Sequence, residues 1–269
     1  MRKSLLLVAV LPGIFLPGLF STGSAAAAGS ATAAGSPPVR DAYGHSVKGR
    51  SLIDWRQGDP DAQFRVLVVG SIHGDERQGM RVVANLRQRL AGKNGPQGVG
   101  FWTIRTANPD GTARNTRRNA RLVDLNRNFP YRWDGSLNGG YNSGSRPASE
   151  PETRALMRFV GRIGFDLAIW FHQPWGRTLV PCNRDRRWAL LYSRLSGLGT
   201  GQGCDRGSYP GSAISWQHHE YGTTAFVVEF GPRLQKQQVI SRHARAVFQL
   251  AKHMARHGQR RYFGTEEKG

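Results

Sequence analysis

The chain has 269 residues, 39% of them hydrophobic, and 38 Lys and Arg against 18 Asp and Glu give it a formal net charge of +20. This length and hydrophobic fraction suffice for a packed core and limit the fold to one α/β domain or two small ones. The charge indicates either a polyanionic partner or general solubility. No helix-turn-helix, zinc-finger or RNA-binding signature accompanies it, so nucleic acid is not the expected partner.

Residues 1–28 are predicted to be a cleaved signal peptide. Arg2 and Lys3 precede an apolar run, residues 5–20, that is broken by prolines and is shorter than a membrane span. The small residues 24–28 offer cleavage sites. A retained N-terminal anchor is the alternative. We expect a secreted protein with no transmembrane segment after the leader is cleaved.

The rest of the chain divides into a linker, one domain and a tail. Residues 29–40 are Ala, Gly, Ser and Pro for the most part and predict a flexible linker. Residues 41–262 are predicted to form the functional domain, and residues 263–269 a polar tail. The two cysteines, Cys182 and Cys204, are expected to form a disulfide in an exported protein, with two free thiols as the alternative.

The first strong strand signal is residues 64–70, a run rich in β-branched residues that leads directly to His73. A helix is predicted over residues 76–90. Its apolar residues recur at helical spacing: Met80, Val83, Leu86 and Leu90. A strand, a tight turn and a helix therefore follow one another, and His73 lies at the carboxyl end of the strand.

A second strand is predicted over residues 101–106, and the turn residues 108–111 end it. A later helix is predicted to begin near Pro151, because proline suits the first turn of a helix. Ser149 is expected to cap this helix, and Glu152 to complete a capping box with it.

Two more predicted strands each end at a residue that can do chemistry. Residues 167–171 lead to His172, and residues 225–228 lead to Glu229. A final helix over residues 235–257 has an apolar side and a basic side. Its histidines are expected on the solvated side: His243, His253 and His257.

The alternation of strands and helices predicts an α/β fold, with a largely parallel sheet that helices cover on both faces. In such sheets functional groups gather at the carboxyl ends of the strands. His73, His172 and Glu229 all lie where this rule places a site.

His73 and Glu76 lie three residues apart across a strand-to-helix turn, so both side chains can point at one cation. Catalytic zinc commonly takes two His and one Glu and keeps a fourth position for water, and His172 is the candidate for the third ligand. A His-x-x-Glu pair alone is common by chance. The position of all three residues after predicted strands makes a zinc site the leading hypothesis.

Glu229 has two interpretations. It is either a buried carboxylate paired with one of the many arginines, or a general base that takes a proton from water and passes it to a leaving amine. Because it follows an apolar strand, as His172 does, we expect it at the same site.

Asn126 and Arg127 form an amide and guanidinium pair that suits bidentate capture of a substrate carboxylate. A surface arginine in a basic segment is the alternative. Upstream, Arg117 is the candidate to stabilise the oxyanion of a tetrahedral intermediate. Arg118 and Arg121 remain alternatives for that role.

Together these motifs resemble the zinc carboxypeptidase family, and they appear in that family's order. The residues that carry the resemblance are His73-x-x-Glu76, Asn108-Pro109-Asp110-Gly111, Arg117-x-Asn119, Asp124-Leu125-Asn126-Arg127-Asn128, His172 and Glu229. The resemblance implies a three-layer α/β/α domain around a mixed, largely parallel eight-stranded sheet. It also implies these roles: one zinc ion on His73, Glu76 and His172, Arg117 at the oxyanion, Asn126 and Arg127 on the substrate carboxylate, and Glu229 as base.

Four segments carry a finer resemblance: His73-Gly74-Asp75-Glu76, Ser149-Glu150-Pro151-Glu152-Thr153, His172-Gln173-Pro174, and Tyr209-Pro210-Gly211-Ser212 followed by Trp216. Within the family, they resemble the murein peptide amidases, which cut the bond between γ-D-glutamate and meso-diaminopimelate in cell-wall peptides. Asp75 is a departure, because the digestive members have Arg there. Tyr209 aligns loosely with their mobile tyrosine and is a candidate substrate-binding residue, with Tyr221 as the alternative. Ile214 lies near the position of the specificity-pocket floor and argues against an acidic floor.

The leading hypothesis is therefore a secreted zinc metallopeptidase or amidase whose substrate is a murein peptide. We also expect its charge to associate with anionic cell-wall polymers. A general zinc carboxypeptidase that releases C-terminal amino acids is the first alternative. A non-catalytic cell-wall-binding protein with the same fold is the second.

Overall fold

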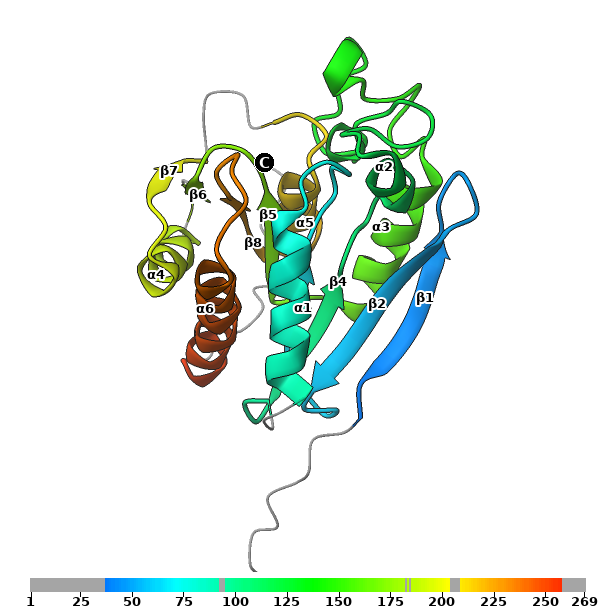
Figure 1. The fold of residues 1–269 in the computed structure, drawn as a ribbon. Coiled ribbons are helices and arrows are strands. Elements are labelled where there is room, and N and C mark those ends of the chain that lie inside the picture. Colours follow the sequence, from blue (N-terminus) through cyan, green and yellow to red (C-terminus); the bar gives the residue numbers. More distant parts are fainter. Residues whose placement is uncertain (1–36, 92–94, 182, 184, 204–208, 258–269) are drawn as a thin grey trace, which may run out of the picture. The chain divides into compact units, whose positions relative to one another are not determined.

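A mixed sheet runs through the protein, with the strand order β1-β2-β4-β3-β5-β8-β6-β7 in the part of the chain that the structure describes (Figure 1). The structure is a computed structural model that describes residues 37–91, 95–181, 183, 185–203 and 209–257. The predicted signal peptide, most of the linker, the polar tail, Cys182 and Cys204 lie outside these residues. None of the helices described is both long and apolar enough to cross a membrane.

The centre of the sheet is parallel, and antiparallel pairs flank it on both sides. The strands are β1 (Val39–His45), β2 (Ser51–Gly58), β3 (Phe64–Val69), β4 (Val99–Ile104), β5 (Leu167–His172), β6 (Arg177–Val180), β7 (Thr200–Gln202) and β8 (Thr224–Glu229). Parallel pairing joins β4 to β3, β3 to β5, β5 to β8 and β6 to β7. Antiparallel pairing joins β1 to β2, β2 to β4 and β8 to β6. The prediction of a mixed, largely parallel eight-stranded sheet is confirmed.

Helices cover both faces of this sheet (Figure 1). They are α1 (Gln78–Ala91), α2 (Pro109–Arg114), α3 (Pro151–Ile163), α4 (Arg186–Ser196), α5 (Ala213–Tyr221) and α6 (Gln237–Arg256), with short 3₁₀ turns η1 (Leu125–Arg127) and η2 (Gly139–Tyr141). Val66 and Val68 of β3 pack into a core with α1, α4 and α6, whereas Leu67 and Val69 pack into a second core with α3 and α5. Because successive side chains of a strand point to opposite faces of the sheet, β3 contributes to both cores. The sheet and the helices on its two faces form three layers.

The predicted capping box at α3 is wrong, although the helix itself begins at Pro151. Glu150 is the N-cap residue and its side chain makes no capping hydrogen bond. The Ser149 hydroxyl instead lies 2.8 Å from a Glu150 carboxylate oxygen. Glu152 accepts hydrogen bonds from the Val47 backbone at 3.0 Å and from the Asn119 amide at 3.2 Å. Distant segments use both side chains, so neither caps the helix.

The prediction for the histidines of α6 is partly wrong. His253 and His257 are exposed, as expected, but His243 is only 1% exposed. Its ring packs edge-on against Phe230 with the ring centroids 4.6 Å apart, and its Nδ1 lies 2.7 Å from the Tyr192 hydroxyl. His243 therefore belongs to the apolar side of the helix.

Candidate active site

The first two candidate ligands lie on the tight turn that follows β3. Gly74 lies inside this turn, and a Cβ atom there would overlap the backbone of Gly111 and Thr112 in α2. Only glycine therefore lets the turn pack closely against α2. This packing holds His73 and Glu76 on the same side of the turn, at the carboxyl edge of the sheet.

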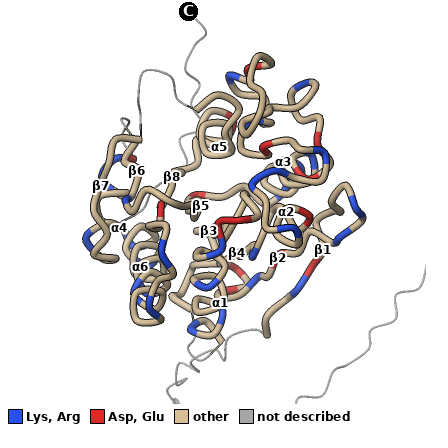
Figure 2. The backbone as a smooth tube through the Cα atoms, turned by 45° about the horizontal axis from the view of Figure 1, so that its top comes forward, with Lys and Arg blue, Asp and Glu red and all other residues tan. Residues whose placement is uncertain are grey.

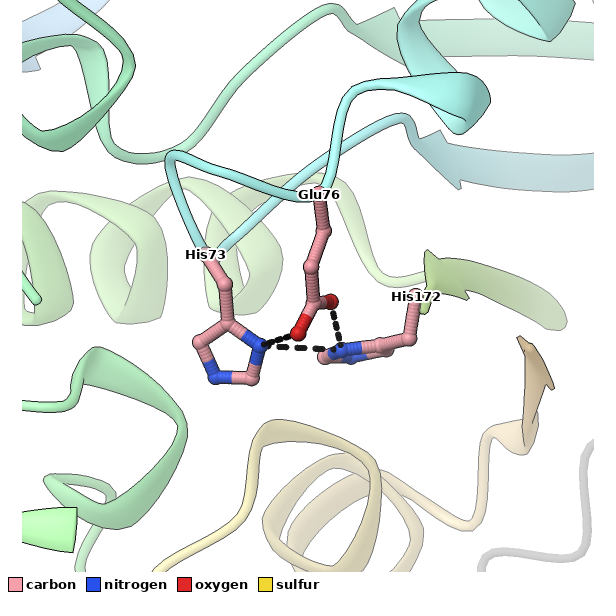
Figure 3. Close-up of side chains that lie close together, drawn as sticks. All are labelled: His73, Glu76 and His172. Carbon is pink, nitrogen blue, oxygen red and sulfur yellow. Dashed lines mark hydrogen bonds and ion pairs between the residues drawn. The ribbon is translucent and has the colours of Figure 1, made fainter. Parts of the chain in front are cut away.

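The structure brings His73 and Glu76 together with His172, which lies at the end of β5 (Figure 3). One Glu76 oxygen lies 2.8 Å from His73 Nδ1 and the other lies 2.9 Å from His172 Nδ1, and the two Nδ1 atoms are 3.2 Å apart. All three residues are buried. Two imidazoles and one carboxylate that converge in this way match the donor set of a catalytic zinc site.

Burial and the neighbouring carboxylates act in opposite directions on the histidines of this cluster, and at His172 burial prevails and lowers the pKa. Burial lowers the pKa of His73, but Asp124 and Glu76 more than offset it and raise the pKa to about 9. Burial raises the pKa of Glu76, but the two imidazoles hold it well below its usual range. The site therefore keeps a carboxylate charged in a buried position, which favours a bound cation.

Asp124 lies behind the cluster and is fully buried. One of its oxygens lies 3.0 Å from His73 Nε2, and the other accepts hydrogen bonds from Arg117 Nε at 3.0 Å and Nη2 at 2.8 Å. A carboxylate on the outer nitrogen of a metal-binding histidine fixes the tautomer and orientation of the ring. Asp124 is thus a functional residue to which the sequence reasoning gave no role, although it lies two residues before Asn126.

Glu229 ends β8 and pairs with His172 across the two parallel strands. It is 6% exposed, and its Oε2 has no hydrogen-bond partner among the described residues. Burial, followed by the negative charge of Glu76, raises the pKa of Glu229 to about 7. The Trp175 backbone donates a hydrogen bond to this carboxyl group, and no arginine forms an ion pair with it in the part of the chain that the structure describes, so the geometry favours a general base over a buried ion pair.

The predicted anion-binding residues line the same pocket as His73, Glu76, His172 and Glu229. Arg127 is 8% exposed and donates from Nη1 to the backbone oxygen of Asn126 at 2.8 Å. Arg117 is held between Asp124 and Glu76, which raise its pKa although burial lowers it. Arg118 and Arg121 are not among the lining residues. They instead contact the Gly139 backbone and Glu150.

Aromatic side chains surround the two guanidinium groups. Tyr209 lines the pocket with its ring centroid 5.2 Å from Arg127 Cζ. Tyr141 was not predicted from the sequence. Its ring centroid lies 5.1 Å from Arg117 Cζ and 5.5 Å from Arg127 Cζ, and the residue is 54% exposed. Tyr221 is outside the pocket and packs edge-on against Trp216.

Apolar side chains also line the pocket: Leu179, Val227, Pro174 and Trp175. Ile214 is not among the lining residues and packs into the core beside α3 and α5 instead. Its predicted position at the pocket floor is therefore wrong. Among the described residues, the acidic residues that line the pocket are Glu76 and Glu229.

Comparison with known proteins identifies the family. The model of the zinc carboxypeptidase family matches residues 38–194. The chain belongs to this family. Its members are zinc-dependent hydrolases, and the cluster of His73, Glu76 and His172 fits their metal.

Two curated relatives illustrate the similarity. Murein peptide amidase A of Escherichia coli K12 is 31% identical over 168 residues, which cover 58% of this chain and 65% of the relative. Carboxypeptidase SOL1 of Arabidopsis thaliana is 30% identical over 144 residues, which cover 48% of this chain and 28% of the relative. The chain therefore matches less than two thirds of either relative's length.

Solved structures share the fold. Murein-tripeptide amidase MpaA from Escherichia coli O157 has a TM-score of 0.60 and 25% identity, covering 80% of this chain and 92% of that chain. Carboxypeptidase A from Helicoverpa armigera has a TM-score of 0.69 at 15% identity, covering 81% of this chain and 69% of that chain. The expected relation to the murein peptide amidases is thus confirmed as a similarity.

Proposed function

We propose that this protein is a zinc-dependent amidase that hydrolyses an amide bond near a substrate carboxylate. One observation carries the proposal. A single pocket is lined by the His73, Glu76 and His172 donor set, by the unpartnered oxygen of Glu229, and by Asn126 and Arg127. These are the groups that amide hydrolysis beside an anion needs.

Each residue has a distinct task in this mechanism. Arg127, with Asn126 beside it, binds the substrate carboxylate and so fixes which amide lies at the reaction centre. His73, Glu76 and His172 would hold zinc, which when bound would supply a Lewis acid for the carbonyl and lower the pKa of the water that Glu229 deprotonates. Glu229 accepts the proton from the attacking water and returns it to the leaving amine. Arg117 stabilises the negative charge that develops on the carbonyl oxygen.

The proposed substrate is a cell-wall murein peptide, cut between γ-D-glutamate and meso-diaminopimelate. Support comes from the similarity to murein peptide amidase A in sequence and to a murein-tripeptide amidase in structure. The diaminopimelate residue carries the carboxylate that Asn126 and Arg127 would bind.

A general zinc carboxypeptidase is a second candidate, favoured by a specific observation. Leu179 and Val227 give the pocket an apolar wall, which suits an apolar C-terminal side chain beside the carboxylate held by Arg127. Carboxypeptidases are also among the similar proteins. A non-catalytic wall-binding protein is less well supported, because the donor set and Glu229 are both in place.

Purified zinc-loaded protein should be incubated with the tripeptide L-Ala-γ-D-Glu-meso-diaminopimelate and, separately, with ordinary peptides that end in Leu or Phe. We expect mass spectrometry to detect free diaminopimelate, chelation to abolish its release and zinc to restore it. Cleavage of the ordinary peptides alone would identify a general carboxypeptidase. Absence of both zinc binding and hydrolysis would support the non-catalytic alternative.

The proposal includes export, with the leader, linker, domain and tail at the boundaries predicted from the sequence. N-terminal sequencing of the mature protein from the culture medium or cell wall should find a start near residue 29. Under non-reducing conditions, peptide mapping should also find Cys182 and Cys204 linked. A mature protein that begins at Met1 and stays in the cytoplasm would contradict export.

A further inference from the structure

One surface of the protein carries basic residues without acidic ones. Helices α4 and α6 lie side by side in Figures 1 and 2, and a Cβ at Gly197, which follows α4, would lie 2.9 Å from Arg242 of α6. Neither helix contains Asp or Glu. Their exposed basic side chains are defined here as the α4–α6 basic surface: Arg186, Arg187, Arg194, Arg242, Arg245, Lys252 and Arg256.

Apart from Arg187, whose Cζ lies 4.4 Å from the centroid of the Trp188 ring, these side chains make no polar or aromatic contact among the described residues that would hold the fold together. None of the seven forms an ion pair or a side-chain hydrogen bond with another described residue. By contrast, Arg81 of α1 donates to the Gln235 backbone at 2.7 Å, and Arg87 of α1 donates to the Thr103 backbone at 2.8 Å. Arg81 and Arg87 of α1 thus make internal contacts, whereas the side chains of the α4–α6 basic surface are exposed to solvent.

The arrangement of these charges is unfavourable for the helices themselves. Arg186 and Arg187 lie in the first turn of α4, where the helix dipole favours acidic residues. In α6, Arg242 and Arg245 are three residues apart and Lys252 and Arg256 are four apart, spacings at which like charges repel. Helix stability therefore does not explain this surface, and a bound polyanion would relieve the repulsion.

The shape of the surface fits a linear partner. Residues 242, 245, 249, 252 and 256 follow one stripe along α6, and four of them are basic. At 1.5 Å per residue the stripe is about 21 Å long. The α4–α6 basic surface holds six arginines and one lysine, and guanidinium groups bind phosphate oxygens in pairs. A chain of phosphate groups would contact several of these side chains at once.

Two other polyanionic partners fit less well. Nucleic acid without a groove-reading element is usually bound by stacking bases on exposed aromatic rings, but Trp188 and Tyr192 of α4 are buried. A membrane-binding helix needs exposed apolar side chains beside its basic ones. Among the described residues, the exposed large hydrophobic side chains all lie outside α4 and α6.

We propose that the α4–α6 basic surface binds a linear phosphodiester polymer of the cell wall and so keeps the enzyme beside its substrate. The inference rests on the proposed export to the wall. Helix α6 starts shortly after Glu229 at the carboxyl edge of the sheet, so a polymer along it leads toward the active site. The polymer is a docking partner and is not cleaved.

The test measures binding of fluorescently labelled poly(glycerol phosphate) to the full mature protein. In the test variant, Arg242, Arg245, Lys252 and Arg256 are replaced by Gln, which keeps helix propensity. The matched control replaces four exposed arginines elsewhere by Gln: Arg40, Arg105, Arg146 and Arg158. We expect the test variant to lose about tenfold or more in affinity and the control about threefold or less. We also expect the dependence of log affinity on log salt to fall by about one for each lost contact.

Equal losses in the two variants would overturn the proposal, because the binding would then reflect net charge alone. Tighter binding of DNA with the same number of phosphates, or of vesicles with anionic lipids, would assign the surface to another partner and also overturn it. Hydrolysis of the soluble tripeptide should be unchanged in the test variant. Because polymer binding is measured without turnover, failure of the proposed hydrolysis and failure of this proposal are distinguishable.

Discussion

His73 and His243 are both buried, at 2% and 1% exposure, yet their pKa values shift in opposite directions. Asp124 and Glu76 lie beside His73 and raise its pKa to about 9 against the effect of burial. His243 has Phe230, Tyr192 and Phe171 around its ring, and burial, followed by the charge of Arg242, lowers its pKa to about 4. Two carboxylates therefore outweigh burial at His73, whereas burial prevails at His243, and it also prevails at His172, which has Glu76 beside it.

The two regions consequently differ in what a substitution should do. At the carboxyl edge of the sheet, substitution of a buried charged residue should change metal binding and catalysis. In the core beside α6, substitution of His243 should change only the free energy of unfolding.

Glu229→Gln should reduce kcat about 10³-fold to 10⁴-fold, because the amide cannot accept the proton that the carboxylate takes. Zinc content and KM should change little, since Glu229 is not among the three converging donors. Steady-state kinetics with the murein tripeptide and metal analysis would measure both. Glu220→Gln, at an exposed position, is the control. A Glu229→Gln variant that keeps more than about a tenth of kcat would remove Glu229 from the mechanism.

Asp124→Asn should weaken zinc binding about 10-fold to 100-fold, because the outer partner of His73 loses its charge. The same change releases Arg117 from its ion pair, so kcat/KM should also fall when zinc is saturating. Zinc affinity is measured by competition with a chelator, and kcat/KM at excess zinc. Asp61→Asn, at an exposed position, should leave both unchanged. Unaltered zinc affinity in Asp124→Asn would show that zinc binding does not depend on this buried carboxylate.

The central strands and the residues that follow them were predictable from the sequence. The apolar runs of β3, β5 and β8 each lead into a site residue, His73, His172 or Glu229, and the structure places all three at one pocket. A strand's apolar run and its end are local features. The parallel pairing of β3, β5 and β8 then brings their ends together.

Other features depend on contacts between distant segments and could not be predicted in this way. Ser149 and Glu152 matched a capping box, but Asn128, Asn119 and Val47 use their side chains instead. Tyr141 is the last residue of the short 3₁₀ turn η2, where the sequence has no periodic pattern, so nothing in the sequence predicts that it packs on two arginines.

His243 is a different kind of error. It lies four, seven and eleven residues before Val247, Leu250 and Met254, so the helical period places it on the buried stripe. The sequence analysis nevertheless placed His243 on the solvated side of the helix, with the other histidines. The pattern was therefore present, and the residue type misled the interpretation.

Tyr141→Leu should raise KM about fivefold for a substrate with a free carboxylate and leave kcat nearly unchanged. Its ring lies against Arg117 and Arg127, and such cation–π contacts are worth about 1 kcal/mol. Tyr141→Phe should restore the normal KM, because the ring and not the hydroxyl makes the contact. Tyr221→Leu is the control outside the pocket.

The comparison of substrates sharpens this prediction. An analogue with a carboxamide in place of the carboxylate should be bound equally by the Leu variant and the parent, since it does not depend on the Arg127 charge. Equal KM increases for the acid and the amide would mean that Tyr141 only shapes the pocket.

His243→Gln tests the other side of the comparison and has the smallest expected effect. The folded-state pKa of His243 is about 4, below the ordinary 6.5, so the unfolded chain binds the proton first as pH falls. The stability due to the neutral ring is present above pH 6.5 and is lost progressively as pH falls toward 4. Between about pH 7 and pH 6 this linkage lowers the free energy of unfolding by about 0.7 kcal/mol. The Gln variant can still accept a hydrogen bond from the Tyr192 hydroxyl. Its free energy of unfolding should lack this part of the pH dependence.

Urea unfolding of metal-free protein at both pH values measures the difference, because chelation removes the pH dependence of zinc binding. His253→Gln, which removes an exposed histidine from the same helix, should keep the slope of the parent. If the two variants show the same pH dependence, the aromatic surroundings of His243 do not disfavour its charge, and the contrast with His73 fails. If His243→Gln alone flattens the slope and leaves kcat and zinc affinity intact, buried histidines on the two sides of the molecule have separate tasks.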